Sequence, residues 1–296
     1  MARLRPRLTA IAHELLDEVT VADTFDLMDG FADVFPVLAI CEVLGIPERD
    51  HRQFKAWGNA VAADLDALVP SHRQRAATRA LGELGDYMGD LIARRRRDPG
   101  DDLVSRLAMV DHDGDQLTDR EVVSTSMLLL IAGFETTTNL LGNGTLALVR
   151  NRDQLDWLRA DLAQVPNAVE ELLRFDSPVQ MSARFLGEPM EAADGTVVPA
   201  GSAITLFLGA ANRDPEVFAD PHRLDLARAD ARKHLAFASG PHYCLGAALA
   251  RLEGEIAFTA LLERLGDLRL AGEPRRRPTF VLRGMESLPL VARPGA

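Results

Sequence analysis

The sequence predicts a mainly helical fold with a few short β-strands in its C-terminal half. Three observations support this fold class. Apolar residues recur at helical spacing through most of residues 4–175. Between residues 180 and 208 the spacing of apolar residues changes to the alternation typical of β-strands, and turn-forming residues separate these segments. The tail, residues 268–291, has the same strand-like pattern.

The first helices are separated by residues that end helices. Leu8 and Ile11 lie on one apolar face of the first segment. Gly45 and Pro47 end the second. Four arginines, 94–97, close the fourth, where cations suit the negative C-terminal end of a helix. We expect helices over residues 4–19, 26–44, 48–65, 71–97 and 101–110.

The longest expected helix runs for about 30 residues, or about 45 Å, to residue 150. Thr118 and Glu121 form a capping box at its start. Its middle, residues 132–139, reads Ala-Gly-Phe-Glu-Thr-Thr-Thr-Asn, which is poor helix-forming sequence. Threonines can bond back to the backbone and bend a helix. An acid beside a hydroxyl at a bend suits a proton relay next to a ligand; the alternative is a helix that tolerates polar residues where it crosses a neighbour.

Two shorter helices, residues 151–162 and 167–175, follow. The second carries Glu171 and Arg174, three residues apart on one face. As a surface ion pair they would contribute only about 0–1 kcal/mol. Pro178 ends this helix. Later in the chain comes a long loop in which apolar residues have no clear periodicity, and such a loop is usually functional or held by specific contacts. Short strands are expected at residues 180–186, 196–198 and 202–208.

The most specific local pattern surrounds Cys244. It follows a glycine- and proline-containing loop and stands at the start of a helix that runs to Leu265. Amide groups at a helix N-terminus favour an anion, here a thiolate. A thiolate in an apolar setting is what haem iron needs as a proximal ligand, and Gly240 and Gly246 let the backbone approach a bulky planar group. The alternative is that Cys244 is a small buried hydrophobe.

Composition narrows the class of protein. The chain has 296 residues, of which 47% are hydrophobic and 26% charged, and this composition is typical of a globular protein. A net charge of −11 argues against general nucleic-acid binding. Two cysteines do not make a disulfide framework, and Cys41 has a packing role. The basic N-terminus lacks the apolar region of a secretory signal, and the longest apolar stretch, residues 127–133, is too short to span a bilayer.

Three motifs, in the same order as in the family, resemble those of the cytochrome P450 superfamily: an oxygen-activation motif, an acid–arginine pair and a haem loop. They read Ala132-Gly133-x-Glu135-Thr136, Glu171-x-x-Arg174 and Phe237-x-x-Gly240-x-x-x-Cys244-x-Gly246. The sequence between these motifs is similar to that of soluble bacterial members of the superfamily, especially actinobacterial ones. The resemblance implies one P450 domain over residues 1–296, mainly α with small β-sheets. Because residues 1–19 resemble a helix well inside the family's chain, we expect the N-terminal strands and first helices of the fold to be absent.

The resemblance also implies roles for individual residues. Cys244 would be the axial thiolate ligand of heme b, iron protoporphyrin IX. Glu135 and Thr136 would be the acid–alcohol pair that delivers protons to dioxygen on the distal side. Arg184 and His242 would bind the haem propionates through charge-assisted hydrogen bonds.

Further residues follow from the same resemblance. Those expected to contact the cofactor are Ala132, Gly133, Phe237, Gly240 and Gly246. A structural triad beneath the haem, costly to break if buried, would consist of Glu171, Arg174 and Arg223. The substrate pocket would be lined by Phe134, Val179, Gln180 and Met181.

The function that this resemblance implies is a cytoplasmic haem-thiolate monooxygenase. It would insert one oxygen atom from dioxygen into a small hydrophobic substrate of secondary metabolism, with electrons from a ferredoxin-type partner. No membrane or nucleic-acid partner is expected. The alternative is a non-catalytic P450-like auxiliary protein, or a truncated fragment that does not hold haem. The presence of Cys244, Glu135 and Thr136 favours descent from an enzyme.

Overall fold

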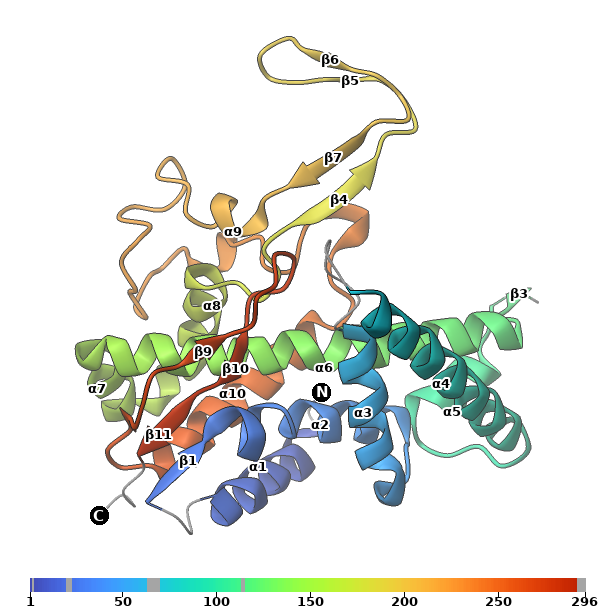
Figure 1. Ribbon diagram of the computed structural model, residues 1–296, viewed down its shortest axis with the longest axis horizontal. Helices are drawn as coiled ribbons and strands as arrows, with labels where there is room; N and C mark the ends of the chain where they lie inside the picture. Colours follow the sequence, from blue (N-terminus) through green and yellow to red (C-terminus); the bar gives the residue numbers. More distant parts are fainter. Residues whose placement is uncertain (2, 20–22, 63–69, 113–114, 292–296) are drawn as a thin grey trace.

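The computed structural model describes residues 1, 3–19, 23–62, 70–112 and 115–291. One helix, α6 (Asp119–Arg150), crosses the whole body of the molecule, and most of the other helices pack around it (Figure 1). The helices of the N-terminal half are α1 (Arg5–Val19), α2 (Phe35–Leu44), α3 (His51–Ala62), α4 (Ser71–Arg97) and α5 (Leu103–Met109). Those that follow α6 are α7 (Arg152–Ala160), α8 (Val165–Phe175), α9 (Leu208–Ala211) and α10 (Ala247–Arg264).

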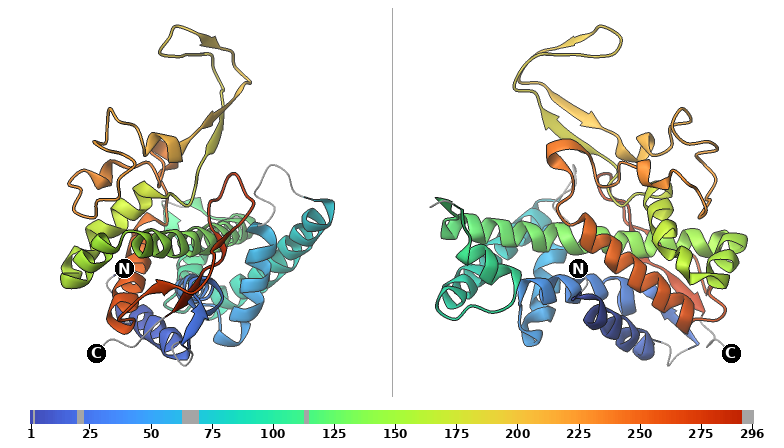
Figure 2. Two further views of the ribbon diagram at one scale, coloured as in Figure 1. Left: turned by 60° about the vertical axis from the view of Figure 1, so that its left-hand side comes forward. Right: turned by 180° about the vertical axis from the view of Figure 1, so that it is seen from behind.

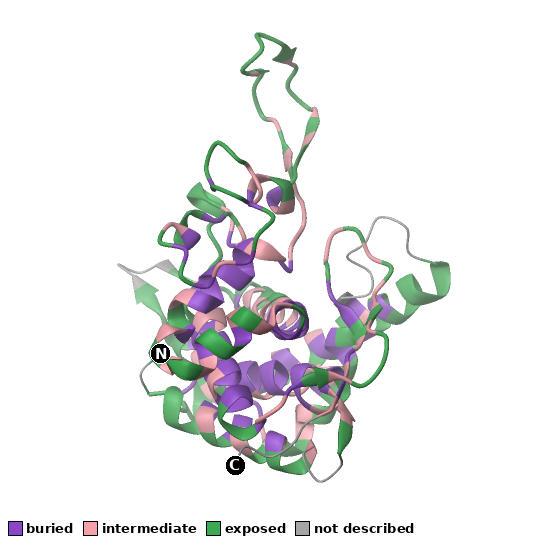
Figure 3. Cartoon of the chain, turned by 90° about the vertical axis from the view of Figure 1, so that its left-hand side faces the viewer, coloured by how far each residue is buried: buried purple, intermediate pink, exposed green. Residues whose placement is uncertain are grey.

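The predicted long helix is confirmed, and its capping box is present. The Thr118 hydroxyl accepts from the Glu121 N–H at 3.3 Å, and the Glu121 carboxylate accepts from the Thr118 N–H at 2.8 Å. From Phe134 onward nearly every residue of α6 is buried. Helices α2, α3, α4, α8 and α10 pack against α6, and α10 also packs on α1 (Figure 2). Buried residues therefore gather around this helix (Figure 3).

The strands form small antiparallel sheets. One has the order β1 (Thr24–Asp26), β11 (Pro289–Val291), β8 (Arg269–Leu270), so it joins both ends of the chain. The two-stranded sheets pair β2 (Asp111–His112) with β3 (Asp115–Gln116), β4 (Ser182–Phe185) with β7 (Ala203–Leu206), β5 (Met190–Glu191) with β6 (Val197–Val198), and β9 (Arg275–Arg276) with β10 (Met285–Ser287). The β4–β7 hairpin projects from the body, and β5 and β6 form its tip (Figure 1).

The prediction of one helix over residues 26–44 is wrong. The structure divides this stretch into β1, a π-helical turn over Met28–Ala32, and α2. The Asp26 carboxylate accepts from the Met28 N–H at 2.9 Å and from the Leu288 N–H at 3.0 Å, which fixes the end of β1 against the C-terminal strands. Pro36 then lies in the first turn of α2, a position that proline favours. The end of the helix expected over 48–65 lies partly outside the described residues, and no helix of the described part is long and apolar enough to cross a membrane.

Candidate functional site

The loop before α10 is shaped by backbone hydrogen bonds around Cys244. The Cys244 N–H donates to the Phe237 carbonyl at 2.9 Å, which closes the loop at its two ends. Between them Gly240 has φ +65°, the left-handed conformation that glycine adopts at little cost, and it starts the 3₁₀ turn η5 (Gly240–His242). Ala238 also has a positive φ, +56°. The loop therefore places Cys244 three residues before the first residue of α10.

Two free cysteines occupy opposite environments. Cys41 is buried in α2, and burial, with a smaller contribution from Asp50, raises the pKa of its thiol to about 12. Cys244 is exposed. Beside it Tyr243 is 51% exposed and Leu245 81% exposed. An accessible thiol between apolar side chains fits a planar apolar macrocycle that is bound through sulfur, so these residues fit haem.

The two side chains expected to hold propionates differ in exposure: Arg184 is half-buried and His242 is exposed. Arg184 lies on β4, where its Nη1 donates to the Ser182 hydroxyl and to the Ala183 carbonyl, each at 2.7 Å. His242 ends the 3₁₀ turn of the cysteine loop. Neither side chain is fully buried, so both are at least partly accessible to an anionic group. The binding of propionates by these two side chains stays a prediction.

The middle of α6 contains two threonines that bond back to the helix. The Thr136 hydroxyl donates to the Ala132 carbonyl at 3.0 Å, and the Thr137 hydroxyl donates to the Gly133 carbonyl at 3.3 Å. The helix is continuous through this turn. Ala132 is exposed and Thr136 is half-buried, so this face of α6 is accessible. A hydroxyl and a small residue on one accessible face suit contact with a ligand.

Phe134 and Glu135 point into packed surroundings instead. Phe134 is 2% exposed and packs on α3 at Gly58, where a Cβ atom would lie only 2.2 Å from the phenyl ring. Glu135 is buried and forms an ion pair with Arg277, which follows β9. Arg277 also lies 3.5 Å from a carboxylate oxygen of Asp33. One guanidinium therefore stands between two carboxyl groups from distant parts of the chain.

The environment of these two carboxyls raises their pKa values above the ordinary range, although Arg277 lies beside both. Burial raises the pKa of Glu135, the nearby Asp33 raises it further, and Arg277 opposes both. Burial likewise raises the pKa of Asp33 against the influence of Arg277. The Oε2 atom of Glu135 makes no hydrogen bond of good geometry among the described residues, although the Asn139 side chain lies close enough to lower the pKa slightly. Glu135 is thus a buried, ion-paired acid whose pKa lies above its ordinary value.

We expect Arg277→Gln to make stability more dependent on pH. Without the guanidinium the pKa values of Glu135 and Asp33 rise further. A carboxyl with a raised pKa keeps its proton in the folded state after the unfolded state has lost it, so the free energy of unfolding falls as pH rises. Urea unfolding should show that the variant loses about 1–3 kcal/mol more than the wild type between about pH 5 and pH 8. Adding Glu135→Gln should recover part of this loss, and equal pH slopes in all three chains would contradict the assignment.

The acid–arginine pair on α8 is buried, not exposed. Arg174 Nε lies 2.7 Å from Glu171, and both side chains are fully buried. The second cation on Glu171 is Arg228, at 3.2 Å. The prediction that Arg223 completes this triad is wrong, because its side chain is exposed and only its backbone carbonyl joins the network, by accepting from Arg174 and Arg228. Arg174 also donates to two other loop carbonyls, those of Asn212 and Pro221.

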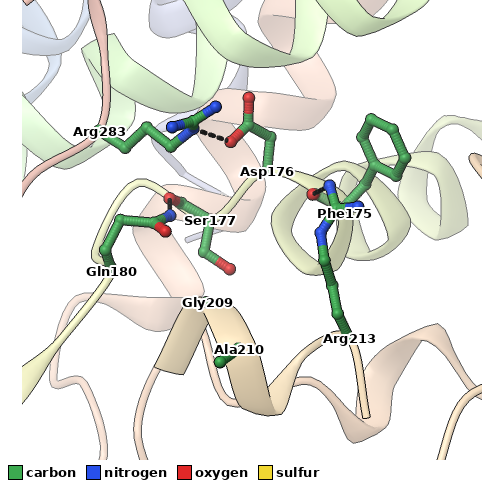
Figure 4. Close-up of a pocket in the computed structure, with 8 residues that line it drawn as sticks. All are labelled: Phe175, Asp176, Ser177, Gln180, Gly209, Ala210, Arg213 and Arg283. Atoms are coloured by element: carbon green, nitrogen blue, oxygen red, sulfur yellow. Dashed lines mark hydrogen bonds and ion pairs between the residues drawn. The ribbon is translucent and has the colours of Figure 1, made fainter. Parts of the chain in front are cut away.

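A cavity of about 350 Å³ opens at the end of α8 (Figure 4). Its lining is polar: Asp176 is paired with Arg283 at 2.6 Å, and Arg213 donates to the Phe175 carbonyl. Gln180 also lies here, with its side chain donating to the Ser177 carbonyl at 2.6 Å. Of the other residues expected in the substrate pocket, Val179 and Met181 are half-buried next to it. Gln180 lines this cavity, whereas the buried Phe134 is not among its lining residues.

Comparison with known proteins indicates the same family as the three sequence motifs. Residues 20–266 match the family model described as Cytochrome P450. The chain is 42% identical to cytochrome P450 107B1 of Saccharopolyspora erythraea over 99% of its length and 71% of that protein. It is 43% identical to the cytochrome P450 monooxygenase PikC of Streptomyces venezuelae, over 99% of the chain and 70% of PikC.

Solved structures are similar over almost the entire chain. The bacillaene polyketide synthase cytochrome P450 PksS of Bacillus subtilis superposes with a TM-score of 0.92 at 41% identity, covering 99% of this chain and 75% of that one. P450BioI, in complex with a fatty-acyl-ligated acyl carrier protein, gives a TM-score of 0.93 at 37% identity, with coverage of 99% and 75%.

Proposed function

The chain belongs to the cytochrome P450 family of monooxygenases, and we propose that it holds haem through Cys244 and inserts one oxygen atom from dioxygen into a small apolar substrate of secondary metabolism. The observation that carries the proposal is the contrast between its two cysteines. Cys41 is buried with a raised pKa, whereas Cys244 is exposed between apolar side chains at the start of α10. Two of the relatives carry the names 6-deoxyerythronolide B hydroxylase and polyketide biosynthesis cytochrome P450 PksS, which supports the proposed class of substrate.

Each side of the proposed site has its own residues. On the proximal side Cys244 would ligate the iron, and Phe237, Gly240 and Gly246 would shape the loop beneath it. Arg184 and His242 would bind the propionates. On the distal side Ala132 and Gly133 of α6 would contact the haem. When bound through a thiolate, haem supplies oxygen-activating chemistry, in which electron donation by sulfur favours O–O cleavage.

The residues of α6 would control protons. The Thr136 hydroxyl, which donates to the Ala132 carbonyl in this structure, would turn that hydrogen bond toward dioxygen and hold a proton there. Glu135 would return protons to this site, with its Oε2 as the atom that takes up and releases them. Burial keeps the pKa of this carboxyl raised, which brings it closer to the working pH of a proton carrier. We propose a cytoplasmic ferredoxin-type protein as the electron donor.

We expect Thr136→Ala to separate haem binding from proton delivery. The variant should keep the thiolate-type Soret band of the reduced carbon monoxide complex, because Cys244 is unchanged. Without the hydroxyl, product formed per oxygen consumed should fall at least about tenfold, with the missing oxygen recovered as peroxide. Oxygen uptake, peroxide and product are measured with a substrate chosen by its effect on the Soret band.

Two other threonine variants control this experiment. Thr136→Ser keeps the hydroxyl and should restore most of the coupling. Thr138 belongs to the same run of threonines, but its buried hydroxyl donates to the Ala32 carbonyl at 2.9 Å, so Thr138→Ala should leave coupling unchanged. Normal coupling in Thr136→Ala would show that this hydroxyl carries no proton.

A further inference from the structure

The helix that follows Cys244 carries an arginine whose side chain returns to the cysteine loop. Arg251 lies in the second turn of α10, with its guanidinium carbon 4.5 Å from the centre of the Phe237 ring. Its Nη1 donates to the Tyr243 hydroxyl at 3.0 Å. Phe237 and Tyr243 are the first residue of the loop and the last one before Cys244. A single cation therefore contacts both ends of the loop.

A buried carboxylate on α8 holds this arginine in place. Glu170 accepts from Nε of Arg251 at 2.7 Å and from Nη2 at 3.2 Å, which is a bidentate pair. The Glu170 side chain is only 1% exposed. Glu170 also accepts from Nε2 of His234 at 2.9 Å, and Nδ1 of that ring accepts from the Ala236 N–H at 3.1 Å. The second contact assigns the ring proton to Nε2, so a neutral His234 can serve as donor.

The charge of Glu170 is secured by these partners. Burial disfavours the ionised form, but the hydrogen bonds from His234 and Arg251 outweigh it and lower the pKa of this carboxyl to about 2. The ion pair with Arg251 thus persists throughout the neutral pH range. It ties α8 and α10 together directly behind the loop, and His234 lies against Phe237 with ring centres 5.6 Å apart.

We propose that Arg251, oriented by Glu170, is a positioning residue that holds the Cys244 loop in the shape needed for sulfur to ligate haem iron. This inference rests on the proposed haem ligation and extends it to residues outside the family motifs identified in the sequence. The link to Cys244 is direct, because the Cys244 N–H donates to the carbonyl of Phe237. If the Phe237 ring loses the guanidinium that covers it, the acceptor for the Cys244 amide is no longer fixed.

Arg251→Gln tests the proposal, and Arg232→Gln is its matched control. The Arg232 guanidinium lies 3.6 Å from the same Glu170 carboxylate, but its side chain is 71% exposed, and none of the hydrogen bonds or ring contacts of the described residues joins it to the loop. Both variants lose one cation near one carboxylate, and only the first loses the contacts to Phe237 and Tyr243.

The first readout uses the haem-free chain. Amide hydrogen exchange is followed in peptides that cover residues 237–244, with α10 peptides as a check that the helix is intact. We expect exchange in the loop to be about tenfold faster in Arg251→Gln, since a lost charge-assisted hydrogen bond has about this effect, and within about twofold of wild type in Arg232→Gln.

The second readout uses the haem-loaded chain. The thiolate-type Soret band of the reduced carbon monoxide complex should decay about tenfold faster in Arg251→Gln than in the control. Tyr243→Phe keeps the ring and the ion pair but removes the hydroxyl contact, so it tests the loop without the risk of unfolding. Its decay should be about threefold faster.

Equal loop exchange and equal band lifetimes in Arg251→Gln and Arg232→Gln would overturn the positioning role. The same holds if loop exchange rises only together with exchange of the entire helix and Tyr243→Phe behaves as wild type. Absence of the thiolate-type band from the wild-type chain would instead refute the proposed haem ligation. In that case the exchange measurements still decide whether Arg251 shapes the loop.

Discussion

Replacement of Arg174 by methionine is expected to destabilise the protein by about 3–5 kcal/mol, a large share of the stability of a typical domain. Arg174 is fully buried, pairs with Glu171, and donates to the carbonyls of Asn212, Pro221 and Arg223. Its removal leaves these three acceptors without this donor in the interior, and leaves Glu171 with only one cation. Urea unfolding of the haem-free chain measures the change in the free energy of unfolding.

Two other arginines test the composition of this triad. Arg228→Gln removes the second cation, which lies 3.2 Å from Glu171, and should cost about 2–4 kcal/mol. Arg223→Gln alters an exposed side chain whose backbone carbonyl stays in place, so it should change stability by less than about 0.5 kcal/mol. A loss in Arg223→Gln as large as that in Arg228→Gln would contradict the network described here.

Replacement of Cys244 by alanine is expected to abolish the thiolate-type Soret band completely. The proposed iron ligand is lost, and the other cysteine, Cys41, is buried in α2 and cannot replace it. Because Cys244 is exposed, the free energy of unfolding of the haem-free chain should change by less than about 0.5 kcal/mol. The spectrum of the reduced carbon monoxide complex and urea unfolding are measured on the same preparation.

Cys41→Ala should give the opposite result. It removes a buried sulfur from the core, so it should lower stability by about 1 kcal/mol while the band remains. The two variants thus separate a ligand from a packing residue within one residue type. A thiolate-type band that survives in Cys244→Ala would exclude Cys244 as the ligand.

Local signals were sufficient where the structure depends on neighbouring residues. The start of α6 is determined by Thr118 and Glu121, whose hydrogen bonds lie within one turn, and the sequence predicted it correctly. The stretch from residue 26 to 44 depends on distant contacts instead. Its first residue, Asp26, pairs through β1 with the C-terminal strand β11, and the apolar spacing that predicted a continuous helix contains no information about that pairing.

The site shows the same division. The haem-loop motif located Cys244 and Phe237, because its residues are adjacent in the chain. The partners that hold charged groups were missed, since Arg228, Arg251 and Arg277 meet their carboxylates only after folding. Arg223 and Arg228 lie in the same loop, where apolar residues show no clear periodicity. Only the path of the backbone determines which of the two side chains is buried. Folding buries Glu135 and Glu170, so each carboxyl needs a cation or a hydrogen-bond donor in the interior, and the sequence does not show which residue supplies it.

The proposed function depends on haem bound through the sulfur of Cys244. Its most direct test is the haem content of the purified wild-type chain, together with the spectrum of the reduced carbon monoxide complex. We predict about one haem per chain and a thiolate-type Soret band, as expected for cysteine ligation. A folded chain that takes up no haem, or one whose band is typical of nitrogen ligation, would contradict this proposal.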